Sequence, residues 1–302
     1  MFSRSMKIGI IQVPADHDHD PAVVARRAEE LGFDSYWLGD HPVVPVDENL
    51  LNYPGRWEEG ANEPPSLVMR ESDPLICLAR ASAATSTIKL GTGVLLPAER
   101  GAILAGSQIG TLDNISGGRL LLGVGTGWNE TECVVMGGDW KRRWTQVTEH
   151  VAAMKALWTT DPSEFHGKYV DFPPVRSFPK PLSKPHPPVL LASMGSPKVF
   201  RRIAEWGDGW IPIVQSAEEL AEGVQQMHAA ADQVGRRRED LSVTVFGLQG
   251  QWRSRSEVEA LHRAGAERVV VWLQDVPLDD LLAEMQSLAD EFGLLSTAAA
   301  KS

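Results

Sequence analysis

The sequence predicts an α/β fold, a single (β/α)8 TIM barrel, with one insertion after the second strand and another before the fifth. Two observations lead to this fold class. Eight short, mostly aliphatic runs recur along the 302 residues, and each is followed by a segment with helical spacing. Alternating strands and helices are typical of a parallel sheet, and continuously apolar strands are typical of a sheet buried on both faces. Eight repeats favour closure into a barrel.

The predicted strands cover, in chain order, residues 7–13, 34–40, 88–96, 119–127, 187–193, 209–214, 242–248 and 267–273. In a parallel barrel the carboxyl ends of all strands meet at one mouth, where barrel enzymes place their active sites. The residues that end these strands are therefore the first candidates for a functional site.

Three helices carry clear start signals. Asp20-Pro21, Asp73-Pro74 and Ser196-Pro197 each place a capping side chain before a proline at the first helical position, where the missing N–H costs nothing. The glycines at 117–118 end another helix. The predicted helices cover residues 21–31, 74–84, 102–115 and 144–158, then one from 197, 217–234, one from about 256 and one ending near 292.

Two connections are too long to be simple turns. Residues 41–72 follow a strand, so they lie at the carboxyl mouth; we interpret them as a lid over the substrate, with a disordered loop as the alternative. Residues 159–186 precede the fifth strand and are expected to form a small hairpin. We expect one domain over residues 1–292 and a flexible tail over residues 293–302.

Composition excludes several classes of protein. The formal net charge of −11 argues against general nucleic-acid binding, and no apolar run approaches the ~20 residues that cross a bilayer. The first ten residues lack the apolar stretch of a signal peptide, and the two cysteines are isolated. These features predict a cytoplasmic protein without a membrane partner.

Four segments in order then suggest a family. They are ELGFDSYWLGDH (30–41), LGTGVLLP (90–97), TLDNISGGRLLLGVGTGWNE (111–130) and LLASMGSPKVFRRIAEWGDGWIP (190–212). Together they resemble the luciferase-like flavin and deazaflavin oxidoreductases, and most closely the branch that uses coenzyme F420, an 8-hydroxy-5-deazaflavin. The resemblance runs from the first strand to the sixth.

The resemblance implies roles for residues at the strand ends. His41, beside the deazaflavin ring, becomes the candidate catalytic proton donor or acceptor, because histidine titrates near neutrality. A bulge with a non-proline cis peptide at Gly93-Val94 is expected behind the ring, with an ordinary packing glycine as the alternative. The implied cofactor-binding residues are Asp40, His41, Thr92, Gly93, Val94, Thr126, Trp128, Asn129, Ala192, Ser193, Met194, Gly195, Ser196 and Lys198.

The turn at residues 193–198 is interpreted as a phosphate site. Backbone N–H groups at a helix N-terminus, with a glycine and a serine hydroxyl, attract anions; ordinary helix capping is the alternative, and the two are compatible. Lys198, Arg201 and Arg202 share one helical face. This face suits the acidic oligoglutamate tail of F420, with a solvated basic face as the alternative.

Two further segments bear on the choice of substrate and on whether a metal is bound. Trp128 stands where the sugar-phosphate dehydrogenases of this branch carry a catalytic glutamate, so we do not expect glucose 6-phosphate to be the substrate. The run of alternating Asp and His at residues 16–20 is interpreted as a hydrated loop and helix cap, not a metal site, because ligands usually come from several elements.

The leading hypothesis is an F420-dependent oxidoreductase that transfers a hydride between the deazaflavin C5 and a small organic substrate. The alternatives are a monooxygenase of the same superfamily that uses reduced FMN, and a non-catalytic flavin-binding protein. The resemblance also suggests a homodimer.

Overall fold

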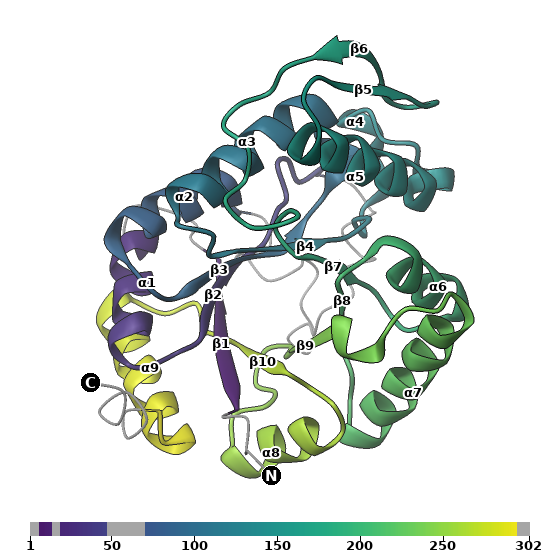
Figure 1. Cartoon of the computed structure of the whole chain (residues 1–302). Helices are drawn as coiled ribbons and strands as arrows, with labels where there is room; N and C mark the ends of the chain where they lie inside the picture. Colours follow the sequence, from purple (N-terminus) through teal and green to yellow (C-terminus); the bar gives the residue numbers. More distant parts are fainter. Residues whose placement is uncertain (1–5, 14–18, 47–69, 295–302) are drawn as a thin grey trace.

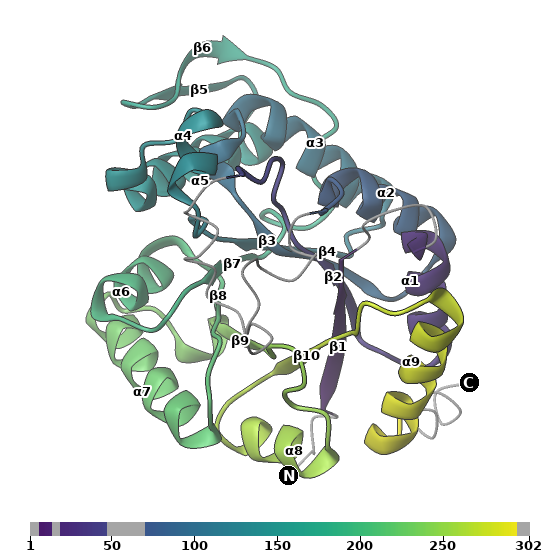
Figure 2. The same cartoon turned by 180° about the vertical axis from the view of Figure 1, so that it is seen from behind.

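The computed structural model describes residues 6–13, 19–46 and 70–294 and shows a closed barrel of parallel strands surrounded by helices (Figures 1 and 2). The strand order around the barrel is β1-β10-β9-β8-β7-β4-β3-β2, and every neighbouring pair is parallel. The predicted fold class is confirmed. The barrel strands are β1 (Lys7–Gln12), β2 (Ser35–Leu38), β3 (Lys89–Leu95), β4 (Leu120–Val124), β7 (Val189–Ala192), β8 (Gly209–Ile211), β9 (Ser242–Phe246) and β10 (Arg268–Trp272).

The outer helices begin where the sequence predicts. Asp20 accepts a hydrogen bond from Ala22 N at 2.9 Å, and Asp73 accepts one from Leu75 N at 2.9 Å, so both are N-caps before a proline. The helices around the barrel are α1 (Pro21–Glu30), α2 (Pro74–Ala84), α3 (Ala102–Ile115), α5 (Arg143–Thr159), α6 (Pro197–Trp206), α7 (Ala217–Gln233), α8 (Arg255–Arg263) and α9 (Leu278–Phe292).

Short elements that the sequence did not predict lie between these helices. They are the six-residue helix α4 (Glu130–Val135) and the single turns η4 (Pro97–Glu99), η5 (Trp140–Arg142) and η6 (Arg238–Asp240). Asn129 caps α4, its Oδ1 accepting from Glu132 N at 3.0 Å. Both α4 and η4 follow barrel strands at the carboxyl mouth, so they place side chains near the predicted site.

The two insertions have different outcomes. Residues 163–175 form the expected hairpin, in which β5 (Ser163–His166) and β6 (Asp171–Val175) pair antiparallel; it lies outside the helical ring beside α5 (Figures 1 and 2). Most of the predicted lid, residues 47–69, lies outside the described residues. At the other end, Leu294 is buried in the core, and residues 295–302 of the expected tail lie outside the described residues.

The barrel interior is filled by side chains. A separate apolar cluster inside the strands contains Ile11, Trp37, Leu121, Leu190, Ile211, Phe246 and Val270. Trp37 packs edge-on against Phe246 with ring centroids 5.2 Å apart. A Cβ on Gly91 would lie 2.1 Å from the Trp37 ring, so β3 needs glycine there. A plugged interior leaves the carboxyl mouth as the place for a site.

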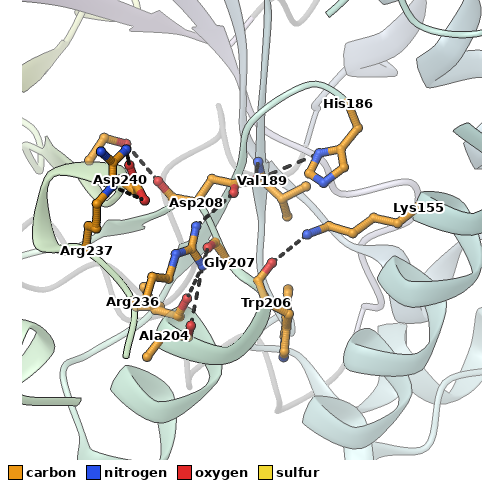
Figure 3. A network of polar contacts seen from close by, with 12 residues as sticks. Lys155, His186, Val189, Ala204, Trp206, Gly207, Asp208, Arg236, Arg237 and Asp240 are labelled. Atoms are coloured by element: carbon orange, nitrogen blue, oxygen red, sulfur yellow. Dashed lines mark hydrogen bonds and ion pairs between the residues drawn. The ribbon is translucent and has the colours of Figure 1, made fainter. Parts of the chain in front are cut away.

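A polar network closes the opposite end of the barrel, before β7 and β8 (Figure 3). Arg236 donates to Gly207 O and, at 3.2 Å, to Asp208 Oδ1, while Asp208 Oδ2 accepts from Val189 N at 2.9 Å. Lys155 donates to Trp206 O at 2.6 Å, and burial lowers its pKa. Because these charged groups bind one another and backbone groups of β7, of α6 and of the residue that follows α6, we assign the network to fold stability.

Candidate active site

His41 lies at the carboxyl mouth, three residues beyond the end of β2. Its Nδ1 is 2.7 Å from Glu132 Oε2, and Trp128 Nε1 donates to its Nε2 at 2.9 Å. The His41 side chain is 13% exposed and that of Glu132 is fully buried. The structure therefore brings together two residues that the sequence predicted for the site, His41 and Trp128, and adds Glu132, which it did not.

These two contacts define one protonation state of His41. An indole N–H can only donate, so Nε2 must carry a lone pair when Trp128 bonds to it. The single ring proton then lies on Nδ1 and is donated to Glu132. In this state His41 is a neutral imidazole whose orientation is fixed by a buried carboxylate.

The surrounding charges favour a second protonation state. Burial opposes charge on His41, but the hydrogen bond to Glu132 and the charges of Glu71, Glu132 and Asp40 outweigh it and raise the pKa of His41 to about 9. An imidazolium has hydrogens on both nitrogens, so it cannot accept from Trp128. Protonation of His41 at Nε2 and the Trp128 contact are therefore mutually exclusive.

Asp40 supports the segment that carries His41. It is 2% exposed, and its carboxylate accepts from Leu96 N at 3.1 Å and from Arg100 Nε at 2.8 Å. Arg100 also donates to Asp73 at 2.9 Å. Because protein donors engage both Asp40 oxygens, its side chain ties the ends of β2 and β3 together. Its expected contact with a cofactor stays a prediction.

The third strand ends in the expected irregularity. The Gly93–Val94 peptide is cis, and the register between β3 and β4 shifts between Thr92 and Leu95. The buried Thr92 hydroxyl donates to Gly123 O at 2.7 Å. A Cβ on Gly125 would lie 2.6 Å from Val94 Cγ2, so this bulge and the fourth-strand turn are in contact. A role in holding a ring stays a prediction.

The turn after β4 is held from several sides. Gly127 has φ 72°, a conformation that favours glycine, and a Cβ there would lie 2.9 Å from Glu99 Oε1. Thr126 Oγ1 accepts from Arg143 Nε at 3.3 Å, and the side-chain oxygen of Asn129 caps α4. Trp128 is thus carried by a fixed turn, and its indole N–H donates to His41.

The predicted phosphate turn has one feature that fits an anion. Ser193 Oγ is buried and has no hydrogen-bond partner among the described residues. Ser193 follows β7 just before α6, whose first turn Ser196 caps by accepting from Val199 N at 3.4 Å. An orphaned hydroxyl beside a helix N-terminus is suited to a phosphate oxygen. Met194 and Lys198 are exposed, and Ala192 packs on the interior cluster.

Two observations bear on this turn and on the basic face of α6. A Cβ on Gly195 would lie 2.8 Å from the buried Phe200 ring, so a larger residue there disturbs packing as well as any ligand. The basic face is also partly occupied: Arg201 pairs with Glu205 at 2.7 Å, and the Arg202 guanidinium lies 5.3 Å from the centroid of the Trp144 ring.

Sequence reasoning missed three carboxyl groups near His41: Glu99 and Glu132 are buried, and Glu71 is half-buried with its Oε2 enclosed. Burial raises the pKa of Glu71 to about 7 and that of Glu99 to about 8; the charges of Asp40 and Glu132 add to both shifts, and that of His41 opposes them. One signal was available, because Glu132 follows Asn129 by three residues, the spacing of a helix cap. The burial of Glu99 had no local signal.

No group of three or more His, Cys, Asp and Glu side chains is placed to hold a metal ion in residues 6–13, 19–46 and 70–294. Two members of the Asp/His run are structural: His19 Nε2 contacts Val276 O at 2.7 Å, and Asp20 caps α1 and pairs with Arg80. Residues 16–18 lie outside the described residues. In the same part of the chain, no helix has the length and apolar character needed to span a bilayer.

Comparison with known proteins identifies the class. The model of the luciferase-like monooxygenase family matches residues 16–298, and the chain belongs to this family. An uncharacterized protein of Mycobacterium tuberculosis is 38% identical over 232 residues, which cover 76% of this chain and 81% of that protein.

Relatives with named activities fall into two cofactor groups. An F420-dependent glucose-6-phosphate dehydrogenase of Amycolatopsis mediterranei is 31% identical over 201 residues, 65% of this chain and 54% of that enzyme. An FMNH2-dependent dimethylsulfone monooxygenase of Pseudomonas putida is 32% identical over 129 residues, 41% of this chain and 35% of that enzyme. The chain therefore belongs to a superfamily of flavin- and deazaflavin-dependent oxidoreductases and monooxygenases.

Solved structures support the fold independently. The coenzyme F420-dependent tetrahydromethanopterin reductase from Methanopyrus kandleri superposes with a TM-score of 0.75 at 18% identity, covering 95% of this chain and 98% of that one. At this level of identity the likeness concerns the fold.

Proposed function

We propose that this protein is an F420-dependent oxidoreductase that transfers a hydride between the deazaflavin C5 and a small organic substrate, with His41 handling the accompanying proton. The observation that carries the proposal is the placement of His41 at the barrel mouth, between a buried carboxylate at Nδ1 and a displaceable donor at Nε2. A general acid or base needs both an oriented ring and one nitrogen that can face the substrate.

The residues present fit such a cofactor. Bound F420 supplies the carbon that gives or takes the hydride. In this proposal Ser193 Oγ, whose hydrogen-bonding capacity is unused among the described residues, and the start of α6 would hold its phosphate, and the bulge at Gly93–Val94 would lie behind its ring. The protein's own contribution is to orient the reactants, exclude water and hold a proton at His41 Nε2.

His41 works in this scheme as follows. In the direction of substrate oxidation, Nε2 takes the proton of the reacting hydroxyl, and Trp128 must first leave that nitrogen. Glu132 remains bonded to Nδ1 and stabilises the imidazolium that forms. In the reverse direction the imidazolium gives its Nε2 proton to the substrate.

Trp128 also bears on the substrate class. An indole at this position makes part of the pocket wall aromatic and offers no carboxylate to a sugar hydroxyl. We therefore propose a substrate other than glucose 6-phosphate, although the Amycolatopsis relative acts on that sugar. Reduction of F420 by glucose 6-phosphate in the presence of this protein would contradict this part of the proposal.

The second candidate is a monooxygenase that uses reduced FMN, supported by the Pseudomonas relative. Titration of the purified protein with oxidised F420 and, separately, with FMN distinguishes the two by their visible absorption. We expect F420 to bind and reduced FMN to cause no oxygen consumption. Tighter binding of FMN, together with oxygen consumption, would move the protein to the monooxygenase class. The expected homodimer and cytoplasmic location remain proposals, testable by light scattering and cell fractionation.

A further inference from the structure

Glu99 is the most unusual buried group near the site. It ends the η4 turn, it is 3% exposed, and both of its carboxyl oxygens are buried without a hydrogen-bond partner among the described residues. An ionised carboxylate buried in this way loses its hydration without compensation, which costs several kcal/mol. A protonated, neutral carboxyl avoids most of this cost.

The turn that carries Glu99 is fixed from both sides. Pro97 O contacts His150 Nδ1 at 2.6 Å, and Ala98 O accepts from Gln146 Nε2 at 3.3 Å, both from α5. On the other side, Leu96 N is bound by Asp40. Because the backbone is held, the Glu99 side chain cannot easily swing out to solvent.

Glu99 lies under the turn that presents Trp128. A Cβ on Gly127 would lie 2.9 Å from Glu99 Oε1, which puts the carboxyl against the residue that precedes Trp128. The groups that act on it electrostatically are Glu132 and Cys133 from α4, His41 and Asp40 from the segment after β2, and Arg100 beside it. Arg100 is already committed to Asp40 and Asp73.

Around His41, carboxyl groups outnumber the cationic side chains that could pair with them. His41 can neutralise one carboxylate, that of Glu132, whose Oε2 lies 2.7 Å from His41 Nδ1. The other oxygen of Glu132, Oε1, is buried and has no partner in the described part of the chain. A second carboxylate beside this pair meets the charge of Glu132, which favours the protonated form of Glu99.

We propose that Glu99 is a buried carboxylic acid that holds the second exchangeable proton of this site and, by gaining or losing it, sets the proton affinity of His41. Glu99 is a positioning residue: its charge acts on the reaction through the His41–Glu132 pair. The inference rests on the proposed proton role of His41. Burial and the charge of Glu132 raise the pKa of Glu99 to about 8, in agreement with a carboxyl that is neutral at pH 7.

The role follows from the coupling of the two titrations. While Glu99 is neutral, the charges that favour the imidazolium of His41 are those of Glu71, Glu132 and Asp40. When Glu99 ionises, its new charge favours the imidazolium, so the last proton of the site is held more tightly. Ionisation of Glu99 therefore raises the proton affinity of His41, and protonation of Glu99 lowers it.

Infrared and NMR spectroscopy of the cofactor-free protein test this without any turnover. In a Glu71→Gln background, which removes the other described carboxyl whose pKa is raised toward neutrality, we expect a protonated carboxylic acid C=O band at pH 6.5 that the further change Glu99→Gln abolishes. We also expect the His41 ring resonances of Glu99→Gln to titrate ~1 pH unit or more lower than those of wild type. Gln keeps the shape and neutrality of the protonated acid, so a merely structural role would leave the His41 titration unchanged. Glu130→Gln, at an exposed glutamate of α4, is the matched control and should change neither signal.

Three results would overturn the inference: in the Glu71→Gln background, a carboxylic acid band at pH 6.5 that persists after Glu99→Gln, or no such band before it, and a His41 titration that is the same in Glu99→Gln and in wild type. If Glu99→Gln does not fold, the spectra of Glu71→Gln at pH 6.5 and 9.5 decide, since the remaining acid band must disappear between them. None of these measurements needs F420. A failure of the cofactor proposal is therefore distinguishable from a failure of this inference.

Discussion

Trp128 Nε1 donates a hydrogen bond to Nε2 of His41 at 2.9 Å across 87 residues of sequence. The bond joins the motif after β2 to the motif after β4 and occupies the nitrogen that a substrate must reach. Because it can form only with the unprotonated nitrogen, it stabilises the neutral form of His41.

Trp128→Phe removes that donor and keeps the aromatic bulk. We expect the pKa of His41 to rise further, because the neutral imidazole loses its partner while Glu132 still favours the charged form. NMR titration of the His41 ring measures the change. Trp140→Phe, at a tryptophan that stacks with Arg143, is the control and should leave the His41 titration in place. A lower pKa in Trp128→Phe would contradict the assigned direction of the bond.

His41→Ala tests the proton role directly. We expect turnover to fall by ~10²–10⁴, the range for loss of a general acid or base, while the dissociation constant for F420 changes little. Steady-state kinetics and an absorption titration measure the two quantities. His166→Ala, at an exposed histidine of the hairpin, is the control. Wild-type turnover in His41→Ala would reduce His41 to a neighbour of the ring.

Glu132→Gln tests the pair through stability. The folded-state pKa of His41, about 9, lies above its unfolded value of ~6.5. The pair therefore stabilises the fold fully below pH 6.5, and this contribution is lost as pH rises through 9. We expect Glu132→Gln to be less stable than wild type at pH 6, with the difference narrowing by pH 9.5. Urea unfolding at the two pH values measures it, and a difference that widens with pH would be inconsistent with a charged pair.

Ser193→Ala tests the phosphate turn with little effect on packing. The Ser193 hydroxyl has no partner among the described residues, so its removal should leave the fold intact. A hydrogen bond to a charged group contributes ~1.5–3 kcal/mol, so we expect cofactor affinity to fall about 10- to 100-fold. Ser256→Ala, at an exposed serine in the first turn of α8, is the control. Unchanged affinity with a folded Ser193→Ala protein would remove the phosphate assignment.

The sequence predicted the barrel because its signals are local. Aliphatic runs, Asp-Pro helix starts and paired glycines each act within a few residues, and the parallel barrel then fixes which strand ends meet. For this reason the sequence predicts that His41 and Trp128 lie in one site. Glu99 and Glu132 were missed because carboxylates are ordinarily exposed, and only tertiary packing buries them. The six-residue helix α4 is also too short to show helical periodicity.

The last prediction concerns the choice between flavins and its dependence on salt. Lys198 is exposed on α6 beside the phosphate turn, whereas Arg201 is paired with Glu205. An acidic tail can therefore be attracted to Lys198 more readily than to the rest of that face. Exposed attraction weakens with salt, because the Debye length falls from ~10 Å at 0.1 M to ~3 Å at 1 M. We expect F420 to bind more tightly than FMN at low salt, and the preference to narrow at 1 M. Lys198→Gln should flatten this salt dependence, whereas Lys168→Gln on the distant hairpin should not. Fluorescence titrations at several salt concentrations measure the slopes, and an F420 preference that is independent of salt would show that the tail does not contact this face.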